Sequence, residues 1–98
     1  MTTEVRRADG RYEIVVDGVV AGFTEAREGD GGVVAMPHTV VEDAFAGRGL
    51  AGELVQGALD DLRSRGRLVH PFCPYVKGWI EKHPAYCDLV DDPDRFGL

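Results

Sequence analysis

The chain has 98 residues, of which 44% are hydrophobic and 29% charged, a balance typical of a folded globular protein and unlike that of a disordered one. Its 17 acidic and 11 basic residues give a formal net charge of -6, which argues against a nucleic-acid partner because such binders carry a basic stripe. No apolar run approaches the roughly 20 residues of a membrane span, so we expect no membrane partner. The length predicts one domain over residues 1–98.

The N-terminal segment and the cysteines indicate a cytoplasmic protein. No apolar run follows the basic residues near the start, so an export signal is not expected. Cys73 and Cys87 are then expected to be reduced thiols in a monomer or a weak dimer. A zinc site is not expected either, because the three histidines and two cysteines fit neither C-x₂-C nor H-x₃₋₅-H spacing.

The first two predicted strands are expected to form a hairpin. Apolar side chains alternate over residues 11–16 and predict a strand. Asp17-Gly18 follows and favours a tight two-residue turn, because both residues tolerate a positive φ. Residues 19–27 predict the return strand.

A third strand is predicted beyond the glycine-rich turn at residues 28–32. Residues 33–41 are rich in β-branched side chains, and Pro37 in their middle indicates a bulge or an unpaired edge. The strands thus form an antiparallel meander. A short later strand at residues 67–70 is joined to the third strand through a helix, so the two are expected to be parallel neighbours.

The second half has helical periodicity. From Gly49 onward one face is apolar, with Leu50, Ala51, Leu54, Val55, Ala58, Leu59 and Leu62. Gly66 ends this helix as a C-terminal glycine. Residues 74–83 predict a second helix that Pro84 stops, and residues 86–98 are expected to be irregular.

The glycine-rich start of the first helix, Gly47 to Gly52, indicates an anion site. The first N–H groups of a helix lack intrahelical partners and carry a partial positive charge. Ala46 and Gly47 offer no side-chain acceptor for them, no acid is expected in the first turn, and Arg48 adds a positive charge. Small residues also allow a ligand to approach the backbone. The alternative is a plain glycine-rich loop that avoids a clash.

These glycines also match G-x-G-x-x-G, but a dinucleotide fold is not expected. The motif follows a meander rather than opening a βαβ unit, and the strand at residues 67–70 lacks the acid that would hold a ribose. A Walker loop is excluded because no Lys-Ser/Thr pair follows the glycines.

Cys73 and His38 are the candidate reactive side chains. Pro74 is favoured at the first position of a helix, which makes Cys73 the N-cap of the second helix, where the helix field favours a thiolate. His38 on the third strand has the chemistry of a general base. The alternatives are a small buried hydrophobic residue for Cys73 and a half-buried strand histidine for His38. Three other residues of these types are expected to be structural: His70, His83 and Cys87.

The layout and the segment Ala46-Gly47-Arg48-Gly49-Leu50-Ala51 resemble the GNAT superfamily of N-acetyltransferases, whose fingerprint is Q/R-x-x-G-x-G/A on a strand-to-helix turn. More closely, the chain is similar to the very small YjdJ-type branch, over about residues 11–90. Further segments carry this resemblance: Arg11-Tyr12-Glu13 with Asp17-Gly18, His38-Thr39, Cys73-Pro74-Tyr75, and His83-Pro84 with Tyr86. It implies an α+β, minimal GNAT-like fold, an antiparallel β-meander followed by helix-strand-helix in a mixed sheet.

The resemblance also implies a cofactor, acetyl-coenzyme A, and an N-acetyltransferase activity toward a primary amine such as one on a protein or peptide. The cofactor's pyrophosphate would lie on the N–H groups of Gly47, Arg48, Gly49, Leu50, Ala51 and Gly52. Its pantetheine arm would run along the backbone of Val40 and Val41, with Tyr75 also in contact. At the reactive end His38 would accept the amine proton, and Cys73 would either take the acetyl group first or shape the pocket.

Two departures from the family pattern keep another function open. Ala46 stands where the fingerprint has Gln or Arg, and Ile80 stands where many members have a tyrosine that protonates the departing thiolate. Tyr75 or Tyr86 would have to replace that acid, or the thiolate would leave unaided. The alternatives are a non-catalytic module that senses acetyl-coenzyme A and a small interaction domain without a cofactor.

Overall fold

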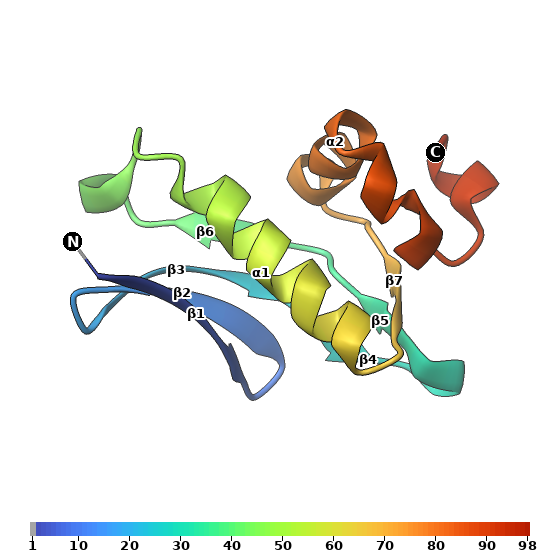
Figure 1. Cartoon of the computed structure of the whole chain (residues 1–98), viewed down its shortest axis with the longest axis horizontal. Helices are drawn as coiled ribbons and strands as arrows, with labels where there is room; N and C mark the ends of the chain where they lie inside the picture. Colours follow the sequence, from blue (N-terminus) through green and yellow to red (C-terminus); the bar gives the residue numbers. More distant parts are fainter. Residues whose placement is uncertain (1) are drawn as a thin grey trace.

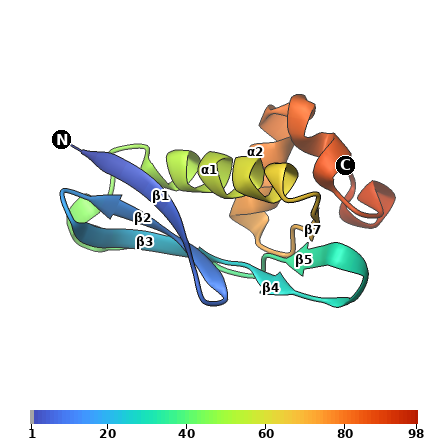
Figure 2. The same cartoon turned by 60° about the horizontal axis from the view of Figure 1, so that its bottom comes forward.

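The structure is a computed structural model that describes residues 2–98 (Figure 1). The long helix α1 (Leu50–Ser64) lies across one face of a four-stranded sheet, and a smaller sheet continues beneath its C-terminal half (Figure 2). Helix α2 (Pro74–Lys82) and the C-terminal segment lie together along one side of α1. The short 3₁₀ helices are η1 (Asp30–Gly32), η2 (Asp43–Phe45), η3 (Pro84–Leu89) and η4 (Pro93–Phe96).

The larger sheet is antiparallel throughout and the smaller one is mixed. The larger sheet has the order β1-β2-β3-β6, with β1 (Thr3–Ala8), β2 (Arg11–Val16), β3 (Val19–Glu25) and β6 (Thr39–Val41). The smaller sheet has the order β4-β5-β7, with β4 (Arg27–Glu28), β5 (Val33–Ala35) and β7 (Leu68–His70). Strands β5 and β7 are parallel, as predicted for neighbours joined through a helix. The predicted α+β fold is thus confirmed, with its mixed sheet formed by the short strands.

Pro37 divides the predicted third strand into β5 and β6. On one side of it, Met36 bonds toward β7: its N–H donates to the His70 carbonyl at 3.0 Å and its carbonyl accepts from Cys73 at 2.8 Å. On the other side, the His38 carbonyl accepts from the N–H of Glu25, the last residue of β3, at 2.8 Å. Alternate residues of a regular strand bond to the same neighbour, so the chain rotates at Pro37, as in a bulge. The sheets part there, and the outer edge of β6 is left open.

Strand β1 was not predicted, because it lacks an apolar alternation. Its sequence, TEVRRA, places Val5 against α1 at Gly57, while most of its other side chains are charged. A Cβ at Gly57 would lie 2.8 Å from the Val5 side chain, so this glycine permits the close approach. Register with β2 and contact with α1, rather than local pattern, therefore determine this strand.

The core lies between α1 and the sheets. The buried face of α1 is Leu50, Leu54, Val55, Ala58, Leu59 and Leu62, as the periodicity predicted, with Ala51 only half-buried. The C-terminal segment is not irregular as predicted: it forms η3 and η4, and Val90 bridges Val69 of β7. None of the helices that the structure describes has the length and apolar character of a bilayer-spanning segment.

A buried tyrosine ties β2 to α1 and predicts a change of stability at high pH. The Tyr12 hydroxyl donates to Asp61 at 2.5 Å, and burial together with this hydrogen bond raises the pKa of Tyr12 to about 12. The neutral phenol is therefore favoured in the folded state, and its stabilising effect should be complete below pH 10 and decline between about pH 10 and 12. Tyr12→Phe should cost about 1 kcal/mol at pH 7. In urea unfolding of both proteins, the gap between them should narrow above pH 10; a gap that stays constant with pH would contradict this assignment.

Candidate functional site

The start of α1 is held by left-handed glycines rather than by a capping side chain. Gly49 is the N-cap with φ 72° and ψ 16°, Gly47 has φ 79°, and no side chain caps the helix. An N-cap is usually an extended Ser, Thr, Asp or Asn that accepts from the first turn. A left-handed residue followed by the helical Leu50 instead turns successive N–H groups toward one point, which is an anion-binding arrangement. These dihedral angles strongly favour glycine at positions 47 and 49.

The first-turn N–H groups have no intrahelical partner. The first bond of the helix runs from the N–H of Glu53 to the Gly49 carbonyl at 3.4 Å, so the amides of Leu50, Ala51 and Gly52 precede the bonded ladder. An anion placed before Leu50 would meet these amides and the positive end of the helix dipole.

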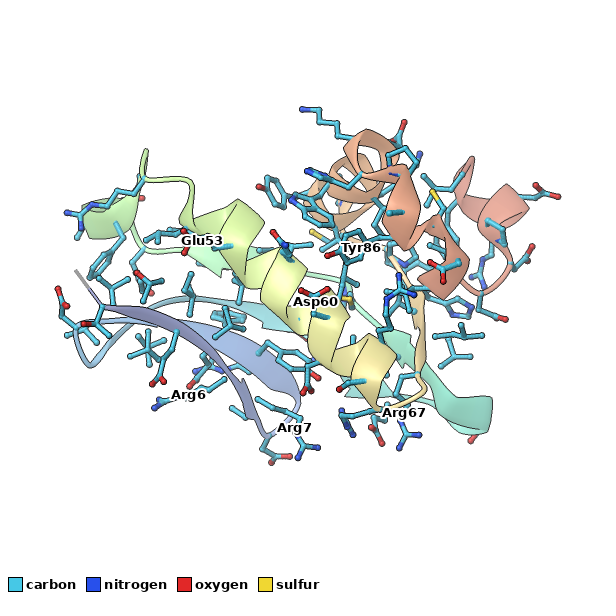
Figure 3. The ribbon with its side chains drawn as sticks, viewed as in Figure 1. Arg6, Arg7, Glu53, Asp60, Arg67 and Tyr86 are labelled. Carbon is cyan, nitrogen blue, oxygen red and sulfur yellow. The ribbon has the colours of Figure 1, made fainter. Side chains whose placement is uncertain are left out.

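The charges around this helix start are mixed. The guanidinium of Arg48 lies 5.4 Å from the centre of the Phe45 ring, on the exposed loop before the helix. The prediction that the first turn lacks an acid is wrong, because the helix begins at Leu50 and Glu53 therefore falls in its first turn. Figure 3 shows Glu53 on the N-terminal half of α1. Glu53 would repel an anion, so binding would depend on direct contact of the anion with the amides and Arg48.

The outer edge of β6 offers backbone groups close to this loop in the chain. Val40 pairs with Phe23 of β3, and the His38 carbonyl also bonds toward that neighbour. In an antiparallel ladder the intervening residues point the other way, so the N–H and carbonyl groups of Thr39 and Val41 face the open edge. Of the two valines predicted to hold an extended ligand, Val41 presents its backbone there, whereas that of Val40 is engaged by β3.

Cys73 lies beside this open edge. It is the N-cap of α2 with Pro74 in the first turn, as predicted, and only 5% of it is exposed. Its Sγ donates to the Thr39 hydroxyl at 3.4 Å, and that hydroxyl is 2.8 Å from the hydroxyl of the fully buried Thr24. A chain of hydroxyls thus fixes the thiol against β6. Thr39 was missed by the sequence reasoning, although it follows His38 directly.

The structure does not bring His38 and Cys73 together. His38 is exposed, and its ring meets the edge of the Phe23 ring with centroids 6.3 Å apart. Its neighbour Thr39 is paired across the strands with Thr24, which is paired with Tyr12, so the three side chains lie on one face of the sheet. The Tyr12 hydroxyl bonds to Asp61 of α1, so this face is the one that α1 covers. Alternation then places His38 on the opposite face of the sheet. The two candidates lie on opposite faces of the sheet at β6.

Two rings from α2 face the first turn of α1. A Cβ at Gly52 would lie 3.6 Å from Trp79 Nε1 and 3.7 Å from the Tyr75 hydroxyl, so both polar atoms border the helix start. Trp79 is buried in the core, and the position of its indole N–H beside the helix start was not predicted. The sequence signal for this position was its spacing: Trp79 comes four residues after Tyr75 and therefore lies on the same face of α2.

Tyr86 is less suited to this site than Tyr75. Its hydroxyl donates to Asp60 at 2.8 Å, further along α1, and this bond together with partial burial raises the pKa of Tyr86. Figure 3 shows Tyr86 and Asp60 beside each other, away from Glu53. Ile80 is fully buried.

The remaining histidines and the second cysteine have structural partners. His70 Nε2 lies 2.9 Å from Asp91 Oδ2. His83 stacks on Trp79 at 3.9 Å, and its Nδ1 lies 2.7 Å from that residue's carbonyl. Cys87 is half-buried against the core. These contacts agree with the structural roles that the sequence analysis expects of them.

The candidate site is an open surface. Two hollows formed by the described residues, of about 450 and 600 Å³, lie elsewhere: one beneath the C-terminal half of α1, beside Tyr12 and Arg65, and one beside Phe72 and Pro74. Neither includes the glycines of the helix start. Gly47 and Gly49 are exposed, so a ligand there would be held by backbone groups and a few side chains rather than enclosed.

Comparison with known proteins identifies the family. Residues 11–89 match a family described as GCN5-related N-acetyl-transferases. The chain is 35% identical over 52 residues to the protein NATD1 of mouse and of human, which covers 53% of this chain and 47% and 46% of those relatives. The match thus spans about half the length of these curated relatives.

The fold is shared with a solved structure. The solution structure of a GCN5-like protein from Staphylococcus aureus superposes with a TM-score of 0.69 at 20% sequence identity. The match covers 90% of this chain and 87% of that one. This likeness confirms the expected fold.

The hydroxyl chain at Cys73 predicts a graded loss of stability. Thr39→Val removes the partner of the Thr24 hydroxyl, which no water reaches, and should cost about 1–3 kcal/mol. Thr39→Ser keeps the hydroxyl and should cost less. The double variant Thr24→Val, Thr39→Val leaves neither hydroxyl unsatisfied and should recover part of the loss. Urea unfolding measures all three; a Thr39→Val protein as stable as the wild type would show that this chain of hydroxyls is unimportant.

Proposed function

The chain belongs to the family of GCN5-related N-acetyltransferases, and on that premise we propose that it transfers the acetyl group of acetyl-coenzyme A to a primary amine. The observation that carries this proposal is the uncapped helix start at Gly49, which follows β6 and its open edge after the short helix η2. One feature suits a diphosphate and the other an extended amide-bearing arm, and acetyl-coenzyme A has both in that order.

The residues for the cofactor follow from these features. The amides from Gly47 to Gly52, with Arg48, would hold the pyrophosphate. The pantetheine arm would pair with the edge of β6 through Thr39 and Val41, as an added strand pairs with a sheet. Trp79 Nε1 and the Tyr75 hydroxyl would border the arm from the side of α2.

The open N–H groups of β6 would also serve the chemistry. An N–H of Thr39 or Val41 directed at the thioester oxygen would stabilise the negative charge that develops there, as an oxyanion site does. Such a donor is preorganised because β3 fixes the strand from its other edge.

We place Cys73 as the nucleophile. Attack of its sulfur on the thioester forms one C–S bond and breaks another, and the thiol proton of Cys73 passes to the departing sulfur. Because both sulfurs belong to thiols, this exchange does not need the phenolic acid that Ile80 replaces. The amine then attacks acetyl-Cys73, forming the C–N bond and releasing the cysteine sulfur, which takes up a proton.

His38 would serve the second step. It faces the side of the sheet away from α1, so the amine would approach from there while the coenzyme lies on the side of α1. His38 would accept the proton that the amine loses, directly or through water. The coenzyme and the amine would thus lie on opposite faces of the sheet at the edge of β6.

The helix start predicts the effect of a single added methyl group on cofactor binding. Gly49→Ala should lower the affinity for coenzyme A about tenfold or more, because relief of the positive φ turns the amides away from their common point. The single tryptophan, Trp79, lies beside Gly52 and reports binding through its fluorescence.

Gly66→Ala is the matched control for this substitution. Gly66 has φ 69°, an added Cβ meets nothing within 4 Å at either position, and it stands at the other end of α1. Both variants should lose about 1–2 kcal/mol of stability, but Gly66→Ala should bind coenzyme A as the wild type does. Equal affinities of the two variants for coenzyme A would contradict binding of its pyrophosphate at the helix start.

The nucleophile has a test of its own. Cys73→Ala should reduce acceptor-dependent thiol release at least about 100-fold, and wild-type protein given acetyl-coenzyme A without acceptor should gain one acetyl group by intact mass. Cys87→Ala is the control and should retain both. Full turnover by Cys73→Ala would mean direct transfer to the amine. Tight coenzyme binding without any acceptor-dependent release would instead indicate a sensing module.

A further inference from the structure

A hollow of about 600 Å³ lies against the chain segment that carries Cys73. It is lined by Pro71, Phe72, Pro74, Lys77, Arg95, Phe96 and Gly97. Pro71 and Phe72 precede Cys73, and Pro74 follows it. A molecule in the hollow would therefore contact the residues on either side of Cys73 in the sequence. We call it the Phe72 hollow.

Two cations face the Phe72 hollow without a carboxylate partner. Neither Lys77 nor Arg95 forms an ion pair with any residue of the range 2–98, whereas six other arginines do. The Lys77 Nζ lies 3.8 Å from a Cβ built on Gly97, which places the ammonium group against the C-terminal segment. In a chain with a formal net charge of -6, two unpaired cations at one hollow are a local reversal of charge.

The same hollow presents apolar surface. Phe72 is 45% exposed, and its ring packs edge-on against that of Phe96 with centroids 5.3 Å apart. The Arg95 guanidinium lies 5.1 Å from the centre of the Phe72 ring, so charge and ring are presented together. The hollow lining contains no acid; Asp92 and Asp94 are exposed on the neighbouring segment but do not line it.

This combination selects an occupant. Carboxylates complement unpaired Lys and Arg groups, and an apolar side chain complements the exposed ring. The open form of the hollow suits a segment of peptide better than an enclosed small molecule. We propose that the Phe72 hollow binds an acidic peptide, and that the acceptor amine is a peptide amine flanked by acidic and apolar residues; this second statement rests on the proposed function.

Amide chemical shifts of the whole ¹⁵N-labelled chain, without coenzyme, test the proposal. The probes are two short capped peptides with a central lysine and a leucine, one with flanking glutamates and the other with glutamines in their place. The acidic peptide should give saturable shifts centred on Phe72, Lys77 and Gly97, and the neutral peptide should bind about tenfold or more weakly. Equal affinities, or shifts centred elsewhere, overturn the proposal.

Substitutions distinguish binding at the hollow from nonspecific attraction of the acidic peptide to positive charge. Lys77→Gln with Arg95→Gln should lower the affinity for the acidic peptide at least about tenfold, because both partners of the carboxylates are removed. Lys82→Gln is the control, since Lys82 is an exposed cation of the same helix that does not line the hollow. An unchanged affinity in the double variant, or an equal loss in the control, contradicts the assignment.

A parallel titration with coenzyme A distinguishes failure of the peptide site from failure of the proposed function. The double variant should bind coenzyme A as the wild type does, by Trp79 fluorescence. A loss of coenzyme affinity in that variant, with peptide binding intact, would assign the two cations to the coenzyme's phosphates and overturn the peptide site. If the chain binds the peptide but no coenzyme, the peptide site is supported and the acetyl-transfer proposal is contradicted.

Discussion

The break in backbone pairing at Pro37 is the constraint on which the rest of this structure depends. Met36 still bonds toward β7, but Pro37 has no N–H to donate, and the chain rotates so that the next residues bond toward β3. This rotation ends the parallel ladder and parts the two sheets. It also leaves Thr39 and Val41 with backbone groups that face the open edge of β6. Without it, β6 would continue as a paired strand and have no open edge for a ligand.

The open edge of β6 is bordered by different groups on the two faces of the sheet. On the side of α1 it meets the uncapped helix start, the Tyr75 and Trp79 rings, and the Cys73 thiol held by Thr39. On the other side it meets His38 and Phe23. In a small fold with few layers, both sides of the sheet are within reach of ligands at this point. Our proposal uses that property by assigning the coenzyme to one side and the amine to the other.

Local pattern was sufficient where the structure is locally determined. The hairpin at Asp17-Gly18, the buried face of α1, and Cys73 as the cap before Pro74 all follow from short-range rules, and the structure contains each of them. Contacts that need register were not predictable in the same way. Strand β1 is identified by pairing with β2, and the separation of His38 from Cys73 depends on a rotation that no local pattern encodes. The position of the Trp79 indole N–H beside Gly52 was not predictable either, because a sequence shows the helix face of a side chain but not its neighbours.

The central claim is that the amides at the start of α1 bind a diphosphate. Amide ¹H–¹⁵N spectra of the wild-type chain titrated with coenzyme A test it most directly. We predict that the largest downfield proton shifts fall on residues 47–52, with smaller changes at Thr39 and Val41, because each of these amides gains a hydrogen bond to the ligand. Saturable binding that moves other amides and leaves residues 47–52 unchanged would contradict the account.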